Sequence, residues 1–334
     1  MLPSTNSMAA EPRAEMAVPA LERRPSARRF VILALGLAGA VVGAIALFNY
    51  LVDPYGMFGR NTLGIYISAE RECKPRMVQG YPHNALLVGN SRIAMTPTKD
   101  LESFQFFNAG LGGGDAEEAY YFLYHYAHHE KLVVLGVELG QGDPIPMQGD
   151  IFGAPSLKTM LNQLLNLRTV EYSVHTIYGH FARLPTFLRA DGSFDPTDWF
   201  EHWDKVNPAH MAWAVGTLKQ GMRGYPAYPP LPMTCYSRIA ECLRERGITC
   251  VVVIPPIYGA AASFLRDPSV TAKYDGWRSR LHAIFSNVVD LSVSPYCAET
   301  NFFRDDPLHF KPDTCVRIMN NEVIPVAKRA MQMP

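Results

Sequence analysis

Short apolar runs alternate with segments of helical composition over most of the chain after residue 84. Each run ends at a glycine, proline or polar residue, as buried strands do, and the predicted strands are Ala85–Val88, Phe104–Phe107, Lys131–Leu139, Thr249–Ile254 and Val288–Leu291. Helices are predicted over Asp115–His129, Cys235–Arg246, Ser269–Phe285 and Pro312–Ala330. The pattern therefore predicts an α/β fold with a three-layer parallel sheet of about five strands.

The segment between the third strand and the helix at Cys235 breaks this alternation. It is rich in proline, histidine and aromatic residues, and helices are predicted over Ser156–Asn166, Thr169–Phe181 and Ala209–Met222. About ninety residues are too many for one crossover connection. We therefore expect a domain over residues 84–331 with a mostly helical insertion over 141–234, which could cover a site.

A long apolar segment precedes the domain. Phe30 to Phe48 contains no charged residue, and at about 1.5 Å per residue it would extend about 28 Å, close to the thickness of a bilayer's hydrocarbon core. We predict a disordered cytoplasmic tail over residues 1–29, a single transmembrane helix over 30–52 and an irregular linker over 53–83.

Two alternatives to a membrane anchor exist. A buried core helix would carry a polar stripe, which this segment lacks. A cleaved signal peptide has a shorter apolar region, although Ala44 to Ala46 could mimic a cleavage site. Four arginines between residues 23 and 29 favour a cytoplasmic N-terminus. The main domain would then be extracytoplasmic, and periplasmic in a Gram-negative bacterium.

Composition limits the possible partners. Lys+Arg and Asp+Glu both number 31, so the chain has no net charge and no sign of a nucleic-acid footprint. None of the 6 cysteines forms a C-x-x-C pair, which argues against a zinc ribbon. A bridge between Cys297 and Cys315 could brace the loop between them. The alternative is that the cysteines are buried free thiols, as Cys250 is expected to be.

Ser91 is the first candidate for chemistry. It lies in Gly89-Asn90-Ser91-Arg92, directly after the first strand, and ligands of open α/β sheets bind at the carboxyl ends of strands. A serine at such a turn could be a nucleophile, with its own backbone N–H directed at an oxyanion. The alternative is a simple turn and helix cap. Arg92 could contact substrate or a carboxylate, or lie on a helix surface.

Asp306 and His309 are the second candidate, shortly before the last predicted helix. A serine nucleophile needs a base, and a histidine base needs an acceptor that fixes its tautomer. If the loop coils, the three-residue spacing lets the Asp306 carboxylate reach Nδ1 of His309 while Nε2 faces Ser91. The alternative is a solvated acidic loop beside one of the chain's 10 histidines.

A glycine-rich run, Asn108 to Gly114, follows the second strand. It lacks the G-K-[ST] ending of a phosphate-binding loop, so we expect no nucleotide and no other cofactor. His125, His128 and His129 have no identifiable ligand partners, and we expect no metal. Aromatic and histidine residues of the insertion could stack on sugar rings or fill a core: Trp199, His202, Trp203, Trp213, Tyr225 and Tyr228.

The order of these motifs resembles the SGNH (GDSL-like) hydrolase superfamily over roughly residues 84–328, the insertion excepted. The first block is matched by Gly89, Asn90 and Ser91, with Asn90 where aspartate is usual. The second block, N-x-G-x-x-G, is matched by Asn108, Gly110 and Gly113, and the last by Asp306 and His309. The resemblance is strongest to membrane-anchored, extracytoplasmic members associated with O-acetylation of cell-surface polysaccharides. It implies a flavodoxin-like sheet.

The resemblance also implies roles. Ser91 would be the nucleophile, His309 the base and Asp306 the residue that orients it. The N–H groups of Ser91 and Gly113 would form the oxyanion hole, and Asn90, Arg92 and Asn108 would contact substrate. The family supplies a further donor, an asparagine, after the third strand. Here that strand ends Glu138-Leu139-Gly140-Gln141, so Gln141 would have to replace it.

Two functions remain open at this stage. One is a serine acyl-ester hydrolase or O-acyltransferase acting on acetyl groups of a cell-surface glycan through an acyl-Ser91 intermediate. The other is an inactive relative that binds the glycan or assists a membrane acyltransferase, which the absence of the third-block asparagine favours. A third hypothesis is a membrane-tethered structural domain that binds no ligand.

Overall fold

The structure is a computed structural model, and it describes residues 27–138, 149–184, 186–194, 196, 208–224, 230–303 and 306–332. The predicted tail lies outside the described residues except at its end, as do parts of the predicted insertion. The chain divides into two compact units, Met1–Ala44 and Ile45–Pro334.

Helix α1 (Ala27–Val52) begins in the first unit and ends in the second. It has 26 residues, and its most apolar 18-residue window has a mean hydropathy of 2.6 with no part of it buried. By length and composition, α1 is a candidate membrane span. Its bounds lie within a few residues of the predicted transmembrane helix.

The second unit contains a five-stranded sheet in which every pair of neighbouring strands is parallel. Its strands follow the order β2-β1-β3-β4-β5, with the bounds β1 Ala85–Val88, β2 Phe106–Asn108, β3 Leu132–Gly136, β4 Thr249–Ile254 and β5 Val288–Asp290. The α/β fold and the number of strands are as the apolar runs predict. Strand β2 begins two residues later and ends one residue later than predicted, and β3 begins one residue later and ends three residues earlier.

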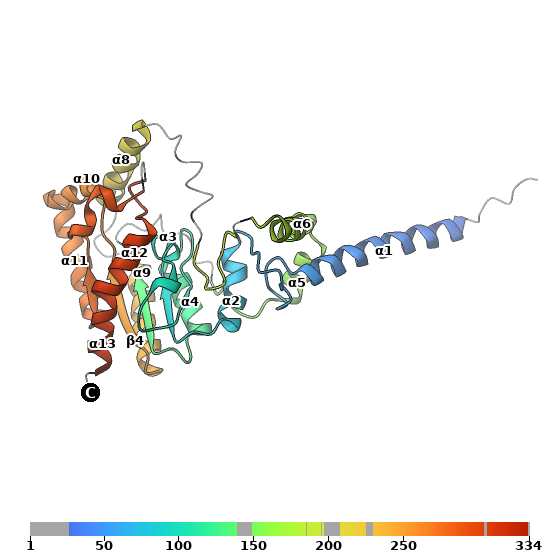
Figure 1. Cartoon of the computed structure of the whole chain (residues 1–334), viewed down its shortest axis with the longest axis horizontal. Helices are drawn as coiled ribbons and strands as arrows, with labels where there is room; N and C mark the ends of the chain where they lie inside the picture. Colours follow the sequence, from blue (N-terminus) through green and yellow to red (C-terminus); the bar gives the residue numbers. More distant parts are fainter. Residues whose placement is uncertain are drawn as a thin grey trace, which may run out of the picture. The chain divides into compact units, whose positions relative to one another are not determined.

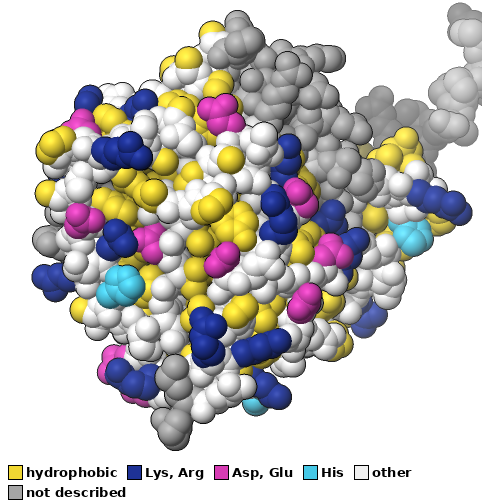
Figure 2. Space-filling model, turned by 60° about the vertical axis from the view of Figure 1, so that its left-hand side comes forward, with side chains coloured by type: hydrophobic (Ala, Val, Ile, Leu, Met, Phe, Trp, Pro, Cys, Tyr) yellow, Lys and Arg dark blue, Asp and Glu magenta, His cyan; other side chains and the backbone are white. Residues whose placement is uncertain are grey.

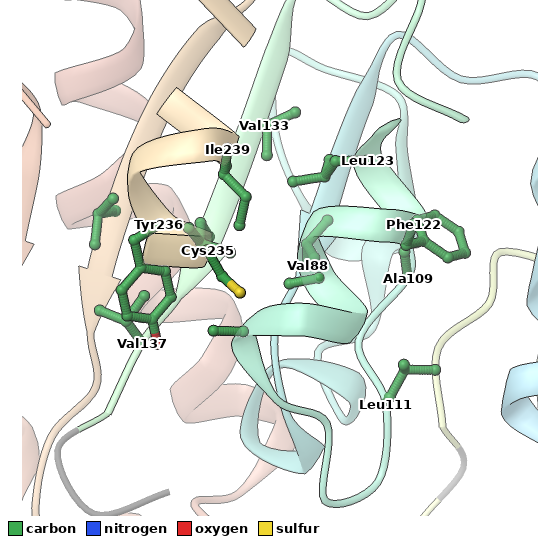
Figure 3. Packing of buried hydrophobic residues seen from close by; sticks show 14 of the residues in the cluster. Val88, Ala109, Leu111, Phe122, Leu123, Val133, Val137, Cys235, Tyr236 and Ile239 are labelled. Atoms are coloured by element: carbon green, nitrogen blue, oxygen red, sulfur yellow. The ribbon is translucent and has the colours of Figure 1, made fainter. Parts of the chain in front are cut away.

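The sheet is buried on both faces because alternate side chains of each strand enter different clusters. On one face, Leu86 of β1 and Val133 of β3 pack with α2 (Glu70–Gly80), α4 (Ala116–Tyr126), α9 (Pro230–Glu245) and α11 (Pro268–Ile284). On the other face, their neighbours Leu87 and Val134 pack with α12 (Pro312–Ile318), a π-helical turn (Met319–Val323) and α13 (Ile324–Gln332). Figure 3 shows Ile239 of α9 and Leu123 of α4 lying over Val133. The three-layer arrangement is therefore confirmed (Figure 1).

Short helices complete the described part of the second unit. They are α3 (Ser91–Ala94), α10 (Gly259–Ala262) and the 3₁₀ turns Thr98–Asp100, Ser263–Arg266, Pro295–Cys297 and Glu299–Asn301. Within the insertion, the structure contains α5 (Leu157–Leu165), α6 (Leu167–Ala182) and α8 (Pro208–Gly224). Their bounds agree with those of the three predicted helices to within two residues. On the face that Figure 2 shows, the described acidic and basic side chains are interspersed, without a large field of one sign.

The prediction of an irregular linker over 53–83 is wrong for its second half. Helix α2 lies there, and Cys73, Met77 and Val78 are buried in the core that covers the sheet. The helix escaped prediction because it contains Pro75 and has many charged residues with few apolar ones. The folded domain therefore begins well before residue 84.

All cysteines are free in the structure, so the bridge considered between Cys297 and Cys315 is not present. Both thiols are buried instead. The Sγ of Cys297 lies 3.3 Å from the carbonyl oxygen of Ser292, and Cys315 of α12 packs in the apolar cluster between this helix and the sheet. The reading as buried free thiols holds for these two residues, and burial raises the pKa of Cys315 to about 12.

One ion pair joins the segment before β1 to the loop before β3. His83 Nε2 lies 3.0 Å from Glu130 Oε1, and Nδ1 lies 2.7 Å from the carbonyl oxygen of Tyr81. Burial alone would lower the pKa of His83, but these two hydrogen bonds outweigh it and raise the pKa above the ordinary 6.5. The folded protein therefore binds this proton more tightly than the unfolded chain does.

The pair predicts a pH dependence of stability. Its contribution is fully present below pH 6.5 and is lost as the pH rises through the raised pKa of folded His83. Replacing His83 with glutamine should therefore lower the free energy of unfolding most at pH 5.5 and least at pH 9. Urea denaturation of the full chain in detergent at both values measures this difference. An equal loss at the two values would contradict it.

Candidate active site

The end of β1 makes a tight turn that sets the position of Ser91. Gly89 has φ +151°, and a Cβ there would contact the side chain of Ile93 and the backbone of Gly136, so only glycine fits. Asn90 then caps α3, because its side-chain oxygen accepts from the backbone N–H of Arg92. Ser91 is the first residue of α3 and remains partly exposed.

The loop before α12 brings an imidazole to this serine across 218 residues of sequence. His309 Nε2 lies 2.8 Å from Ser91 Oγ. His309 Nδ1 lies 2.6 Å from Asp306 Oδ2. The structure therefore brings Ser91, His309 and Asp306 together in the order that the sequence predicts, as hydroxyl, imidazole and carboxylate.

Asp306 is held so that its carboxylate faces the imidazole. Its Oδ1 accepts hydrogen bonds from the backbone N–H groups of Leu308 (2.8 Å) and His309 (3.2 Å), which coils the loop as the three-residue spacing requires. Burial alone would raise the pKa of Asp306, but the hydrogen bonds from His309 and these backbone groups lower it below its ordinary value. An ionised Asp306 accepts a hydrogen bond from Nδ1–H of His309, which leaves Nε2 as the acceptor for the Ser91 hydroxyl.

The glycine-rich loop after β2 packs directly against the serine turn. The N–H of Leu111 donates to the carbonyl of Gly89 (2.9 Å), and those of Gly110, Gly112 and Gly114 also have acceptors. Among the described residues, the backbone N–H groups of Ser91 and Gly113 have no acceptor. These are two of the three donors that the resemblance implies for an oxyanion hole, and Gly113, at φ +61°, is exposed.

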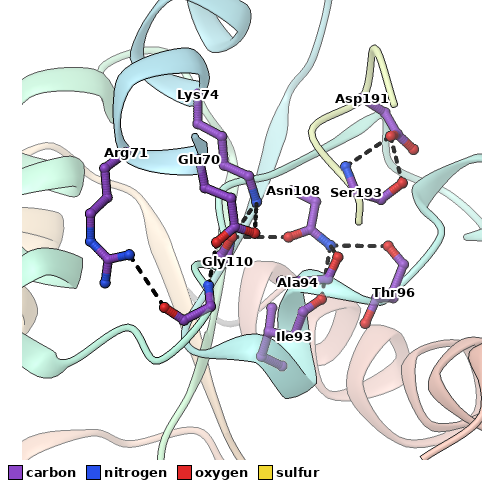
Figure 4. A network of polar contacts seen from close by, with 11 residues as sticks. Glu70, Arg71, Lys74, Ile93, Ala94, Thr96, Asn108, Gly110, Asp191 and Ser193 are labelled. Carbon is purple, nitrogen blue, oxygen red and sulfur yellow. Dashed lines mark hydrogen bonds and ion pairs between the residues drawn. The ribbon is translucent and has the colours of Figure 1, made fainter. Parts of the chain in front are cut away.

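Asn108 is fully buried and holds the two loops together (Figure 4). Its Nδ2 donates to the carbonyls of Ile93, Ala94 and Thr96, and its Oδ1 accepts from the N–H of Gly110. The predicted substrate contact at Asn108 does not fit this burial, because both ends of the amide already bind backbone. The side chain ties the serine helix to the glycine-rich loop instead.

Helix α2 holds the same loop from its other side, and the sequence analysis missed this. The Nζ of Lys74, fully buried, donates to the carbonyl of Gly110, and Glu70 Oε2 accepts from the N–H of Gly112 at 2.5 Å. Arg71 donates to the Gly112 carbonyl at 3.3 Å and to Glu118 of α4 at 2.5 Å. The four-residue spacing of Glu70 and Lys74 was the available signal, in a segment predicted to lack a helix.

The environment of Lys74 is unusual for a lysine. Burial lowers its pKa from 10.5 to about 8, and the nearby Glu70 carboxylate, 3.8 Å away, opposes the shift. At neutral pH the ammonium form therefore predominates and donates a charge-assisted hydrogen bond to Gly110. The loop that carries Gly113 thus depends on one buried cation.

Replacing Lys74 with methionine is expected to lower the free energy of unfolding by about 1–3 kcal/mol, because the buried Gly110 carbonyl would lose its donor. The exposed Lys99 provides the matched control, and Lys99→Met should change stability by less than about 0.5 kcal/mol. Urea denaturation of both variants measures the difference. Equal stability of Lys74→Met and the unmodified chain would contradict this role.

Asn90 and Arg92 are less available to substrate than predicted. Both are buried, and both contact Glu138, which follows β3: Asn90 Nδ2 at 2.8 Å and Arg92 Nε at 3.0 Å from Oε1. Arg92 also donates to the carbonyl of Pro256 at 3.2 Å. Neither a surface position nor a substrate contact fits Arg92, because the guanidinium is enclosed by these partners. Gln141, the predicted third oxyanion donor, lies outside the described residues.

Other histidines predicted to be without ligand partners make hydrogen bonds of their own. His125 Nε2 lies 2.5 Å from Asp150 Oδ2, and His128 Nε2 lies 2.8 Å from the carbonyl of His125. Within the described ranges, no group of three or more His, Cys, Asp and Glu side chains could hold a metal ion. The aromatic residues considered for sugar stacking lie outside the described residues, except Trp213, which is exposed on α8.

No protein-family model matches the chain, and a search of curated proteins found no match. The chemistry of the site is therefore interpreted from the geometry of Ser91, His309 and Asp306. A hydroxyl bonded to an imidazole that is oriented by an ionised carboxylate is the arrangement that activates a serine as a nucleophile. The backbone N–H groups of Ser91 and Gly113, which find no acceptor within the described part of the chain, lie on the two turns beside it, where they could stabilise a developing negative charge.

Proposed function

We propose that the chain is a membrane-anchored serine acyl-ester hydrolase or O-acyltransferase that works through an acyl-Ser91 intermediate. One observation carries the proposal: the unbroken series of contacts from Ser91 Oγ through His309 to Asp306, at 2.8 Å and 2.6 Å. A structural histidine would not need both an aligned carboxylate and a partly exposed serine at the carboxyl end of a parallel sheet.

The reaction follows from these positions. Ser91 Oγ attacks the acyl carbonyl while His309 Nε2 takes its proton, and the Asp306 carboxylate stabilises the imidazolium. The N–H groups of Ser91 and Gly113 receive the oxyanion. His309 then returns the proton to the leaving alcohol as the carbon–oxygen bond breaks. In the second half, water or a sugar hydroxyl gives its proton to His309 and attacks the acyl carbonyl, and His309 returns that proton to Ser91 Oγ as the bond between the acyl carbon and Oγ breaks.

The order of the motifs supports membership of the SGNH hydrolase superfamily as part of the proposal. The serine turn follows β1, the N-x-G-x-x-G block follows β2, and Asp306 and His309 precede α12. The third block departs from the pattern, because Glu138 follows β3 and its carboxylate is bound by Asn90 and Arg92. A missing oxyanion donor costs about 2.7–4 kcal/mol of transition-state stabilisation, so slow turnover is expected unless Gln141 supplies one.

The membrane setting of the proposal rests on α1 and on the arginines that precede the apolar run Phe30 to Phe48. The helix is long and apolar enough to span a bilayer once, and the arginines favour a cytoplasmic N-terminus. The enzyme would then act outside the cytoplasm, which in a Gram-negative bacterium means in the periplasm. By resemblance, the substrates are acetyl groups of a cell-surface glycan, and a membrane acyltransferase is a partner.

Acetate release by the full chain in detergent tests the activity. The purified chain should release acetate from a small acetyl ester faster than protein-free detergent does. Added oligosaccharide should gain acetyl groups if the enzyme is a transferase, and mass spectrometry of the sugar separates the two reactions. Release no faster than the protein-free rate, for several acetyl esters, would contradict both.

A second function is supported by Glu138. A carboxylate beside the serine turn, where the superfamily supplies an amide, disfavours an oxyanion and fits an inactive relative that binds glycan or assists an acyltransferase. Glycan binding distinguishes the two. An inactive binder would hold an acetylated oligosaccharide equally well with and without the Ser91 hydroxyl and would release no acetate.

A further inference from the structure

Helix α6 has its polarity reversed relative to an ordinary surface helix. The side that it buries carries small and mostly polar residues, namely Thr169, Ser173, Thr176 and Gly179. Its exposed side carries large apolar residues, namely Leu167, Val174, Tyr178 and Phe181, beside the exposed polar residues Arg168, Glu171, His175 and His180. Phe181 is 77% exposed and Leu167 is 72% exposed. Since such residues are usually buried, a soluble surface does not explain this face.

Helix α5 continues the same apolar surface. It has no fully buried residue, and its leucines recur every fourth position on the exposed side: Leu157, Leu161 and Leu165. The two helices contact each other and are joined at Asn166, which caps α6. Together, the exposed leucines of α5 and the exposed apolar residues of α6 are seven large side chains on two adjoining helices, which we call the α5–α6 face.

The end of α1 is fixed against these two helices. Asn49, the residue that follows the charge-free run, is 1% exposed. Its Nδ2 donates to the carbonyl of Leu164 in α5 at 2.9 Å, and its Oδ1 accepts from the hydroxyl of Ser173 in α6 at 3.0 Å. These contacts lie within the second unit. If Phe30 to Phe48 spans the hydrocarbon core, Asn49 lies at the membrane–water boundary, and so do the residues that bind it.

We propose that the α5–α6 face lies on the lipid bilayer, with its apolar side chains inserted at the boundary between headgroups and acyl chains. This inference rests on the proposed membrane anchoring. Amphipathic helices of this kind bury an apolar face about 5–10 Å into the interface while a polar flank stays in water. Here the exposed Lys158, Arg168 and His175 supply that flank. A lipid surface is favoured over a protein partner because the hydrogen bonds of Asn49 hold α5 and α6 against the end of the apolar helix.

The consequence for the proposed enzyme is a fixed orientation. A single helix would leave the domain free to rotate above the membrane, whereas a second, interfacial contact restricts that rotation. The hydrogen bonds of Asn49 join the end of α1 to α5 and α6, so the two membrane contacts act together on the domain. The site at Ser91 would then work at a limited range of heights and angles above the bilayer.

Neighbouring residues of α6 offer a matched test, because Val174 and His175 are both exposed but about 100° apart around the helix. The full chain, with Val174→Cys or His175→Cys, is labelled with a nitroxide and placed in phosphatidylcholine vesicles. Electron paramagnetic resonance then measures how often the nitroxide collides with oxygen, which dissolves in lipid, and with a water-soluble nickel chelate. The ratio of oxygen to nickel collisions should be several-fold higher at position 174 than at position 175. The labelled chain without a new cysteine corrects for the native thiols.

A third label separates this inference from the anchoring itself. Val41→Cys lies in the candidate span and should give a high oxygen ratio. A high ratio at 41 with equal, water-like ratios at 174 and 175 would overturn the α5–α6 inference and leave the anchor intact. Shielding of position 174 from both reagents would also overturn it, since a protein or a second copy would then cover the face. A water-like ratio at 41 would overturn both proposals.

Discussion

Replacing Ser91 with alanine is expected to lower kcat for acetyl-ester hydrolysis on the order of 10⁶-fold. The hydroxyl is the only atom of this residue that reaches His309 Nε2, at 2.8 Å, and no covalent intermediate can form without it. The N–H of residue 91 remains in place, so substrate binding should change little. The loss therefore falls on kcat, while KM should stay within a few-fold.

Steady-state kinetics of acetate release measure this loss, and the exposed Ser68 gives a matched control. Ser68→Ala removes a hydroxyl from a position outside the site and should keep full activity. A variant lacking Ser91 that retains the unmodified rate would contradict covalent catalysis at this position, whatever the source of the activity.

Replacing Asp306 with asparagine is expected to lower kcat by about 10⁴-fold. The carboxylate accepts three hydrogen bonds, from His309 Nδ1 and from the backbone of Leu308 and His309, and it has no proton to donate. The side-chain amide of asparagine has only one oxygen, so its NH₂ group must face either His309 Nδ1 or the backbone N–H groups of Leu308 and His309. It then either loses the loop contacts or favours the wrong imidazole tautomer, with Nε2 protonated and unable to accept from Ser91.

The two substitutions should not add. Because serine and carboxylate act in one step, the double variant Ser91→Ala/Asp306→Asn should be no slower than Ser91→Ala alone. The measurement is kcat for the three variants on one acetyl ester. A double variant slower by the product of both effects would show that Asp306 acts independently of the serine, which contradicts the proposed arrangement.

The sheet could be predicted from the sequence because its strands are short and mostly apolar, and β1, β2 and β3 are fully buried. Ala85–Val88 and Thr249–Ile254 have the predicted bounds, since both runs end at residues that stop a strand. Helix α2 could not be predicted, because its helical state depends on contacts made elsewhere. Lys74 binds the loop after β2, and Cys73 and Met77 fill the core, while local propensity opposes a helix at Pro75.

The centre of the site was predictable for a similar reason. The positions of Ser91 and His309 follow from strand ends and from the spacing to Asp306, which are local features. The surroundings were not, because burial is a property of the whole fold. Asn108 and Arg92 have side chains suited to contacting a substrate, but the structure uses them to bind backbone and Glu138. Polar residues near a site are therefore weaker predictions than the residues whose spacing the chemistry requires.

The central claim is that Ser91 is a nucleophile activated by His309 and Asp306. Treatment of the full chain with a serine-directed fluorophosphonate, followed by mass spectrometry of the peptides, tests it without knowledge of the natural substrate. The account predicts a single major adduct on Ser91 that forms much more slowly in His309→Ala. An unlabelled Ser91, or an adduct that forms equally fast without the imidazole, would contradict the account.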